Sequence, residues 1–194
     1  MRKVVLFMVL SVDGFVCGEN DELDWEVQDP EVSRYLLPPI VANADTMLLG
    51  RKLYQGFEQA WPPMAKDESL PQDLRDFANW IEATPKLVFS STLGDLSWQN
   101  SIPVSIKSED DIAQRVQEQK DLDGRDLILF GGAQFAQTLV ARNLVDEYIF
   151  KMQPVALGKG KALFGNLQQR KQLQLLESKS FASGVVTLRY QNAA

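Results

Sequence analysis

The stretch Asp126–Gly165, DLILFGGAQFAQTLVARNLVDEYIFKMQPVALGKGKALFG, predicts a strand, a helix and a second strand in succession. Leu127–Phe130 is a short apolar run typical of a buried strand. The run stops at Gly131-Gly132, and apolar residues at helical spacing follow at once. A second apolar run, Tyr148–Leu157, ends in a loop rich in Gly and Lys. This order of elements is typical of α/β proteins.

The double glycine between the first strand and the helix predicts a place where an anion can bind. The first turn of a helix has N–H groups without intrahelical partners and carries a partial positive charge. Glycine lets a phosphate approach the backbone closely. An ordinary turn would give the same pattern, and the sequence is not G-x-G-x-x-G, so the interpretation depends on the remainder of the chain.

The composition predicts a cytoplasmic protein of one domain, residues 1–194. Hydrophobic residues make up 45% of the chain and charged residues 24%, as in ordinary globular proteins. No apolar run approaches the roughly 20 residues of a membrane span, and we expect no membrane association. The lone Cys17 fits a reducing compartment. The chain has 20 basic and 26 acidic residues, which gives a net charge of −6. Because binding to a phosphate backbone usually needs a basic face, we expect no nucleic-acid partner.

The sequence contains no histidine, which excludes several kinds of catalysis. Ser-His-Asp and Cys-His nucleophilic catalysis and histidine metal ligation are all removed. With one cysteine, a cysteine-rich zinc site is excluded as well, and we expect no metal. Any chemistry must therefore use carboxylates, Lys, Arg, Tyr or an organic cofactor.

Apolar runs and turn signals predict strands alternating with helices along the rest of the chain. The further predicted strands are Lys3–Val12, Thr46–Leu49, Lys86–Ser90, Pro103–Ile106, Leu173–Glu177 and Val185–Tyr190. The further predicted helices are Glu31–Ala42, with a break or kink at Pro38-Pro39, Gln72–Ala83, and one begun by a capping box at Ser108. Ala60–Pro71 carries Trp-Pro-Pro and several charges, which predicts a surface loop.

These elements predict an α/β fold with a central, mostly parallel sheet and an antiparallel C-terminal edge, because the last two strands form a hairpin. In such sheets ligands bind at the carboxyl ends of the strands. Four strand ends rich in Gly, hydroxyl and basic groups then gather there, and they are Asp13-Gly14, Gly50-Arg51-Lys52, Ser90-Ser91-Thr92 and Gly131-Gly132. This combination is typical of a nucleotide site.

The same residues resemble the dihydrofolate reductase superfamily, and most of all the reductase domain of the riboflavin-biosynthesis deaminase–reductase and its stand-alone relatives. Four motifs in order carry the resemblance over nearly the whole chain. They are Ser11–Gly14 (SVDG), Ala44–Arg51 (ADTMLLGR), Lys86–Leu93 (KLVFSSTL), and the series Gly131-Gly132, Leu144–Glu147 (LVDE), Pro154–Gly160 (PVALGKG) and Leu163-Phe164.

The resemblance implies a three-layer fold with helices on both faces of the sheet, and NADPH as cofactor. It implies that Gly131, Gly132, Ala133, Gln134 and Phe135 hold the pyrophosphate and nicotinamide ribose, across a Gly-Gly bond that is often cis in the superfamily. Gly50, Arg51 and Lys52 would hold phosphates, and a guanidinium suits the 2′-phosphate of NADPH. Ser90, Ser91 and Thr92 would bond the adenosine end, and Val12, Asp13 and Gly14 would lie by the nicotinamide.

The activity implied is NADPH-dependent reduction of a small heterocyclic substrate, as in 5-amino-6-(5-phosphoribosylamino)uracil reductase. Asp13 and Glu31 are the candidate catalytic residues, and the proton would come from water or a carboxylate such as Asp13. Asp13, Trp25, Glu31 and Lys159 are the candidate substrate contacts. The alternatives are dihydrofolate reductase activity, with Glu31 or Asp29 holding the pterin, and an NADPH-binding protein without turnover.

Each of these residues also has a structural interpretation. Asp13-Gly14 fits a simple turn, Arg51-Lys52 a solvated helix start, and Ser90–Thr92 loop capping. Trp25 fits packing, Glu31 fits an acid in the first turn of a helix, and Lys159 a solvated loop.

The sequence departs from the family in two places, and the resemblance separately implies that the protein forms a homodimer. Leu53 stands where the family commonly has Thr, and the chain carries no zinc deaminase signature. The resemblance implies a homodimer in which the late strands pack across a two-fold axis. Phe150, Leu173 and Val185 are the expected apolar members of that interface.

Overall fold

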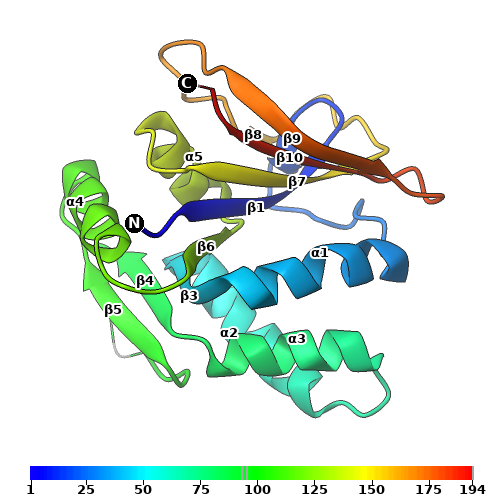
Figure 1. Cartoon of the computed structure of the whole chain (residues 1–194), viewed down its shortest axis with the longest axis horizontal. Helices are drawn as coiled ribbons and strands as arrows, with labels where there is room; N and C mark the ends of the chain where they lie inside the picture. Colours follow the sequence, from blue (N-terminus) through cyan, green and yellow to red (C-terminus); the bar gives the residue numbers. More distant parts are fainter. Residues whose placement is uncertain (93, 95, 194) are drawn as a thin grey trace. The chain divides into compact units, whose positions relative to one another are not determined.

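Strands and helices alternate along the chain in the computed structural model, which describes residues 1–92, 94 and 96–193. Five helices occur in the described residues: α1 (Pro30–Asn43), α2 (Arg51–Lys66), α3 (Gln72–Ala83), α4 (Glu109–Lys120) and α5 (Ala133–Ala141). The strands are β1 (Val4–Ser11), β2 (Phe15–Cys17), β3 (Ala44–Gly50), β4 (Lys86–Ser90), β5 (Ser101–Ser105), β6 (Asp126–Phe130), β7 (Glu147–Gln153), β8 (Lys161–Ala162), β9 (Leu173–Ser180) and β10 (Val186–Asn192). Figure 1 labels them in chain order.

The chain forms two compact units. Unit 1 comprises Met1–Arg2 and Ser33–Ile128, and unit 2 comprises Lys3–Val32 and Leu129–Ala194. In unit 1 the strand order is β5-β4-β3-β6, and β5, β4 and β3 are parallel. In unit 2 the order is β1-β7-β10-β9, with β1 parallel to β7 and the last two strands antiparallel (Figure 1). The predicted fold class is confirmed: α/β, mostly parallel, with an antiparallel C-terminal edge.

Most helix and strand boundaries lie close to their predicted positions, because apolar periodicity marks them clearly. Strands β3, β4 and β6 are largely buried on both faces, as their continuous apolar runs predict. The capping box at Ser108 is also confirmed. Its Oγ accepts a hydrogen bond from Asp111 N at 3.3 Å, and the Asp111 carboxylate accepts one from Ser108 N at 3.1 Å.

The structure contradicts two predictions based on proline, the break in α1 and the loop Ala60–Pro71, whereas a kink in α1 stays a prediction. Helix α1 continues without a break through Pro38 and Pro39, which are both exposed. The predicted loop Ala60–Pro71 is helical as far as Lys66. In this segment the Trp61 ring packs edge-on against the Phe77 ring of α3, with the two ring centroids 5.4 Å apart. This tertiary packing outweighs the local cost of proline in a helix.

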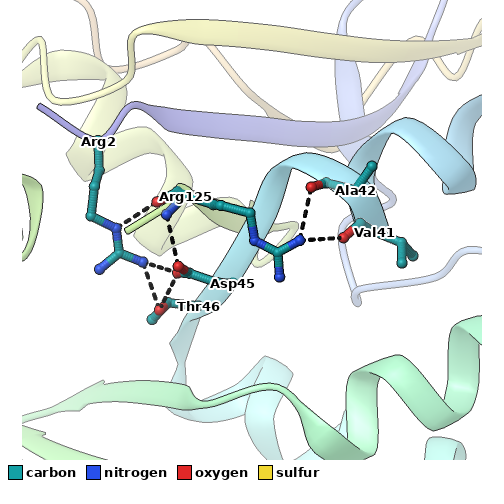
Figure 2. Close-up of polar contacts among 6 residues, drawn as sticks. All are labelled: Arg2, Val41, Ala42, Asp45, Thr46 and Arg125. Carbon is teal, nitrogen blue, oxygen red and sulfur yellow. Dashed lines mark hydrogen bonds and ion pairs between the residues drawn. The ribbon is translucent and has the colours of Figure 1, made fainter. Parts of the chain in front are cut away.

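Figure 2 shows a polar network in unit 1 around Asp45, the acid of the motif ADTMLLGR. The carboxylate accepts hydrogen bonds from the buried Arg2 guanidinium and from Arg125 N, the latter at 2.8 Å. The Arg125 side chain donates to Ala42 O, near the end of α1, at 2.8 Å. Asp45 therefore joins three segments that are distant in the sequence, and this gives the motif's acid a structural role.

Lys86, the first residue of β4, is fully buried in unit 1. Its Nζ donates to backbone oxygens of Glu82, Thr84 and Gln99 at 3.1, 3.0 and 3.3 Å. It also lies 4.2 Å from the centroid of the Trp98 ring. Desolvation by burial nevertheless lowers the pKa of Lys86 to about 8.

Because of this lowered pKa, Lys86 should make stability rise with pH. The folded chain loses the Lys86 proton near pH 8, whereas the unfolded chain keeps it up to its ordinary value of 10.5. Between these values the unfolded state binds more protons, so the free energy of unfolding rises with pH. Urea unfolding of wild type and Lys86→Met at pH 7.5, 9 and 10 measures the difference. An equal pH dependence in both proteins would contradict the prediction.

Candidate functional site

In unit 2, the end of β1 is bonded to the loop 157–161. Asp13 Oδ1 accepts from Leu157 N at 3.1 Å, and Oδ2 accepts from Gly158 N at 2.7 Å. Ser11 Oγ donates to Asp13 Oδ1 at 2.6 Å. The Ser11 bond and the Gly158 bond hold the pKa of Asp13 below its ordinary value of 3.8. Asp13 is therefore ionised at neutral pH and fixes the loop, and it has no proton to donate.

The loop 157–161 is also held against the segment 17–21. Gly160 has φ +148°, and a Cβ there would meet Cys17 O at 2.2 Å, so that only glycine fits. Lys159 Nζ lies 2.7 Å from Glu19, and Lys161 pairs with Asp21. The Lys159 side chain is 77% exposed. Such a pair contributes little to stability, so Lys159 is able to exchange Glu19 for a substrate anion.

Gly131 and Gly132 connect β6 to α5 with φ values of 37° and 74°. The described residues contain no cis peptide bond, so the cis Gly-Gly bond implied by the resemblance is wrong. Two left-handed glycines turn the chain there without one. Gly132 is the N-cap of α5 and supplies no side chain to cap the helix. Ala133, Gln134 and Phe135 form the first turn, whose N–H groups lack intrahelical partners.

Helix α5 is bonded to the turn that follows Asp13. Gln137 Nε2 donates to Ala162 O at 2.7 Å, and Ala162 pairs with Phe15. Leu163 N donates to Gly14 O at 3.2 Å. The structure therefore brings Gly14 and α5 into one hydrogen-bonded assembly within unit 2. The Val12 side chain is exposed, and its N–H bonds Val155 O at 2.9 Å.

Trp25 and Glu31, the other predicted substrate contacts, have local partners in unit 2. Trp25 Nε1 donates to Glu22 O at 3.1 Å, and the ring is half-buried. Glu31 is exposed in the first turn of α1, and its carboxylate lies 4.0 Å from Lys179 Nζ. Asp29 caps this helix by accepting from Glu31 N at 2.8 Å. The Glu31 side chain is 58% exposed, and Asp29 is half-buried and engaged as the helix cap.

In unit 1, parallel strands β3 and β4 end side by side, and their ends bring Arg51 and Thr92 together as predicted. Gly50 is the N-cap of α2, and Arg51 is the first residue of the helix. Arg51 Nη1 donates to Thr92 O at 2.8 Å and also bonds Thr92 Oγ1. Thr92 N donates to Ser90 Oγ at 3.1 Å.

The neighbouring residues of this unit 1 group are exposed. Lys52 and Ser91 both lie at the surface. Leu93, which closes the third family motif, lies outside the described residues.

Both helix starts have the chemistry that a phosphate requires. Neither N-cap glycine offers a capping side chain, and the first turns of α2 and α5 contain no acidic residue. An incoming anion therefore meets N–H donors and a partial positive charge without a competing carboxylate. In α2 the Arg51 guanidinium adds further donors. Each helix start, taken within its own unit, thus fits a phosphate group such as those of a dinucleotide.

Sequence reasoning missed two supporting residues, Ser11 and Gln137. Ser11 stands in the first motif, and its spacing of two from Asp13 was a usable signal. Gln137 gave no signal, because its partner, Ala162 O, lies 25 residues away in the sequence. The described residues hold no group of three or more Cys, Asp or Glu side chains that could bind a metal ion. Within the same range, no helix is long and apolar enough to cross a membrane.

Comparison with known proteins identifies the family. The chain belongs to the RibD C-terminal domain family, whose model matches residues 2–187. It is 33% identical to the uncharacterized protein YyaP of Bacillus subtilis (strain 168) over 189 residues, which cover 97% of this chain and 94% of YyaP.

Solved structures share the fold at low sequence identity. A protein from Shewanella sp. PV-4, whose own assignment to riboflavin biosynthesis is provisional, aligns over 100% of both chains with a TM-score of 0.71 and 19% identity. A diaminohydroxyphosphoribosylaminopyrimidine deaminase/5-amino-6-(5-phosphoribosylamino)uracil reductase from Thermotoga maritima aligns with a TM-score of 0.67 and 12% identity, over 99% of this chain and 57% of that one. The fold is that of the dihydrofolate reductase-like reductase domains, as the motifs predicted.

Proposed function

We propose that this chain is an NADPH-dependent reductase of a small heterocyclic substrate, most like 5-amino-6-(5-phosphoribosylamino)uracil reductase. The family and the fold support a reductase. The observation that carries the cofactor assignment is the Arg51–Thr92 contact at the start of α2, where a guanidinium stands beside an uncapped helix N-terminus. That pairing favours a phosphate monoester such as the 2′-phosphate of NADPH.

In this proposal NADPH, when bound, supplies the hydride, and the chain's own residues align the reactants. Gly132–Phe135 would hold the pyrophosphate at the start of α5, and Arg51, Lys52 and Ser90–Thr92 the adenosine end. Asp13 would position the loop 157–161, from which Lys159 would bind a substrate phosphate. The lowered pKa keeps Asp13 ionised at neutral pH, so Asp13 has no proton to give. We therefore propose water as the proton source.

Asp13→Asn tests this division of roles. Each oxygen of the Asp13 carboxylate now accepts a hydrogen bond from a backbone N–H of the loop. In asparagine an NH2 group replaces one of these oxygens and cannot accept that bond, so the loop should loosen. We expect a fall in kcat/KM of about tenfold with little change in NADPH affinity, since the loop loses a charge-assisted hydrogen bond and the cofactor site stays intact. Wild-type activity should not be lost through Asp13 between pH 8 and 5, because its pKa lies below 3.8.

Turnover of a substrate panel tests the function itself. NADPH oxidation at 340 nm should occur with a phosphoribosylamino-pyrimidine. Methotrexate separates the alternative, because tight binding would favour dihydrofolate reductase activity, which the exposed Glu31 does not support. NADPH binding without consumption across pyrimidines, pterins and quinones would contradict the proposal and indicate a binding protein.

We also propose a homodimer that forms through the edge strand β9. Phe150 and Val185, predicted as interface residues, are only 4% and 0% exposed within the protomer, because their faces pack into the core of unit 2. Leu175 and Leu176 are instead 50% and 43% exposed. A strand at the edge of the sheet that exposes two leucine side chains favours association. Light scattering should give about twice 21.8 kDa, and Leu175→Lys should restore the single-chain mass. A wild-type mass of one chain at all concentrations would rule out the dimer.

A further inference from the structure

Unit 2 contains a polar cavity, widely open to solvent, at the end opposite to Asp13. Its volume is about 380 Å³, and it is lined by Asn143, Arg170, Lys171, Gln172, Asn192 and Ala193. It opens near Asp146, whose carboxylate accepts from Val4 N at the start of β1. Asp13 follows the other end of this eight-residue strand, roughly 20–25 Å away at about 3.3 Å per residue. A ligand in the cavity would therefore not touch the proposed active site.

Two cations stand side by side in this cavity and have spare donors. Lys171 Nζ donates to Asn143 Oδ1 at 2.6 Å, and an ammonium group has two further hydrogens. Partial burial lowers the pKa of Lys171, although Asp146 opposes that shift. Arg170 is exposed, and within the described part of the chain it has no hydrogen bond or ion pair. Its fork of five N–H donors suits an oxyanion.

Asn143 holds Lys171 from an unusual backbone conformation. It ends helix α5 at φ 57°, in the left-handed region where glycine is preferred. Asn143 N donates to Val140 O at 3.2 Å and Leu144 N to Leu139 O at 2.9 Å, as in a Schellman motif. The helix end is thus closed by backbone bonds. The asparagine side chain is free to fix the ammonium group, which a glycine could not do.

The rest of the cavity wall is fixed before any ligand binds. Asn192 Nδ2 donates to Val145 O at 2.8 Å, and Ala193 N donates to Gln172 O at 3.1 Å. These bonds hold the end of β10 against the segment that carries both cations. A wall with fixed geometry reduces the entropy lost when a ligand binds.

We propose that this cavity is a second ligand site, which binds a small phosphate monoester or inorganic phosphate through Arg170 and Lys171. Cavities for small ligands have volumes of about 300–1,000 Å³, so this one accommodates a small phosphorylated metabolite. A guanidinium, an ammonium group and neighbouring amide donors form the set that a phosphate requires. The ligand would stabilise unit 2 because it binds only the folded chain.

Calorimetric and thermal-shift titrations with inorganic phosphate and ribose 5-phosphate test the site, with ribose and ionic-strength-matched sodium chloride as controls. We expect saturable binding of each phosphate and a rise in Tm, and no effect of ribose. Arg170→Ala and Lys171→Met should each weaken binding about tenfold or more, as expected for one charge-assisted contact. Arg51→Ala, which alters the proposed cofactor site, should keep the phosphate binding that Arg170→Ala and Lys171→Met weaken.

Three results would overturn the proposal. The first is an absence of binding at about 10 mM phosphate, a concentration about tenfold above a Kd of 1 mM. The second is an equal rise in Tm with sodium chloride, which would indicate general screening. The third is loss of binding in Arg51→Ala with full retention in Arg170→Ala. Because Arg170 is exposed, its replacement should leave the chain folded, so loss of the site is distinguishable from unfolding.

Discussion

Arg51→Ala is expected to weaken NADPH binding about 10- to 100-fold and to leave NADH binding nearly unchanged, because hydrogen bonds to a charged group contribute about 1.5–3 kcal/mol. Only NADPH has the 2′-phosphate that we propose Arg51 holds. The guanidinium is oriented by its bonds to Thr92, so a phosphate meets donors that are already positioned. Quenching of tryptophan emission during titration with each cofactor measures both affinities.

Two companions make the Arg51 result specific. Arg115→Ala removes an exposed arginine of the same unit whose partner is Glu118, and it should change neither affinity. Arg51→Lys keeps the charge without the planar fork, and it should recover only part of the NADPH affinity. Equal losses of NADPH and NADH in Arg51→Ala would reject a 2′-phosphate contact and indicate a general role of Arg51 in shaping the end of β4.

Asp45→Ala is expected to cost about 3 kcal/mol of stability, because it leaves the buried Arg2 guanidinium without its carboxylate. The Arg125 N–H loses the same acceptor, so the loop before β6 also loosens (Figure 2). For a chain of this length each kcal/mol lowers Tm by about 2–4 °C, so Tm should fall by about 6–12 °C. Calorimetry or circular dichroism during heating measures the change.

Asp123→Ala is the matched control for Asp45→Ala. Asp123 is exposed in the loop before β6, two residues from Arg125. Its replacement should change the free energy of unfolding by less than about 0.5 kcal/mol. If Asp45→Ala lost NADPH binding while its Tm stayed at the wild-type value, the structural role of the motif's acid would be wrong. Loss of stability with retained cofactor affinity would support it.

The sequence by itself determined the fold class and most elements of this protein, for a physical reason. A strand buried on both faces must be continuously apolar, as in Leu127–Phe130, and a helix capped by Ser108 needs an acid three residues later. These are local requirements, and each one is visible within a few residues. The glycines at 14, 131 and 132 were equally visible, because left-handed backbone conformations at chain reversals favour glycine.

Only the tertiary structure decided what the polar residues do. Asp13 was a candidate catalytic residue and one of two candidate proton sources, and its carboxylate is kept ionised by Ser11 Oγ and by Gly158 N, which lies 145 residues away. The prolines of α2 led to the wrong prediction of a loop for the same reason, because the Phe77 ring that packs against Trp61 belongs to another helix, α3. The energy of a carboxylate, a cation or a helix end depends on which distant atoms contact it. Neither periodicity nor motif spacing contains that information.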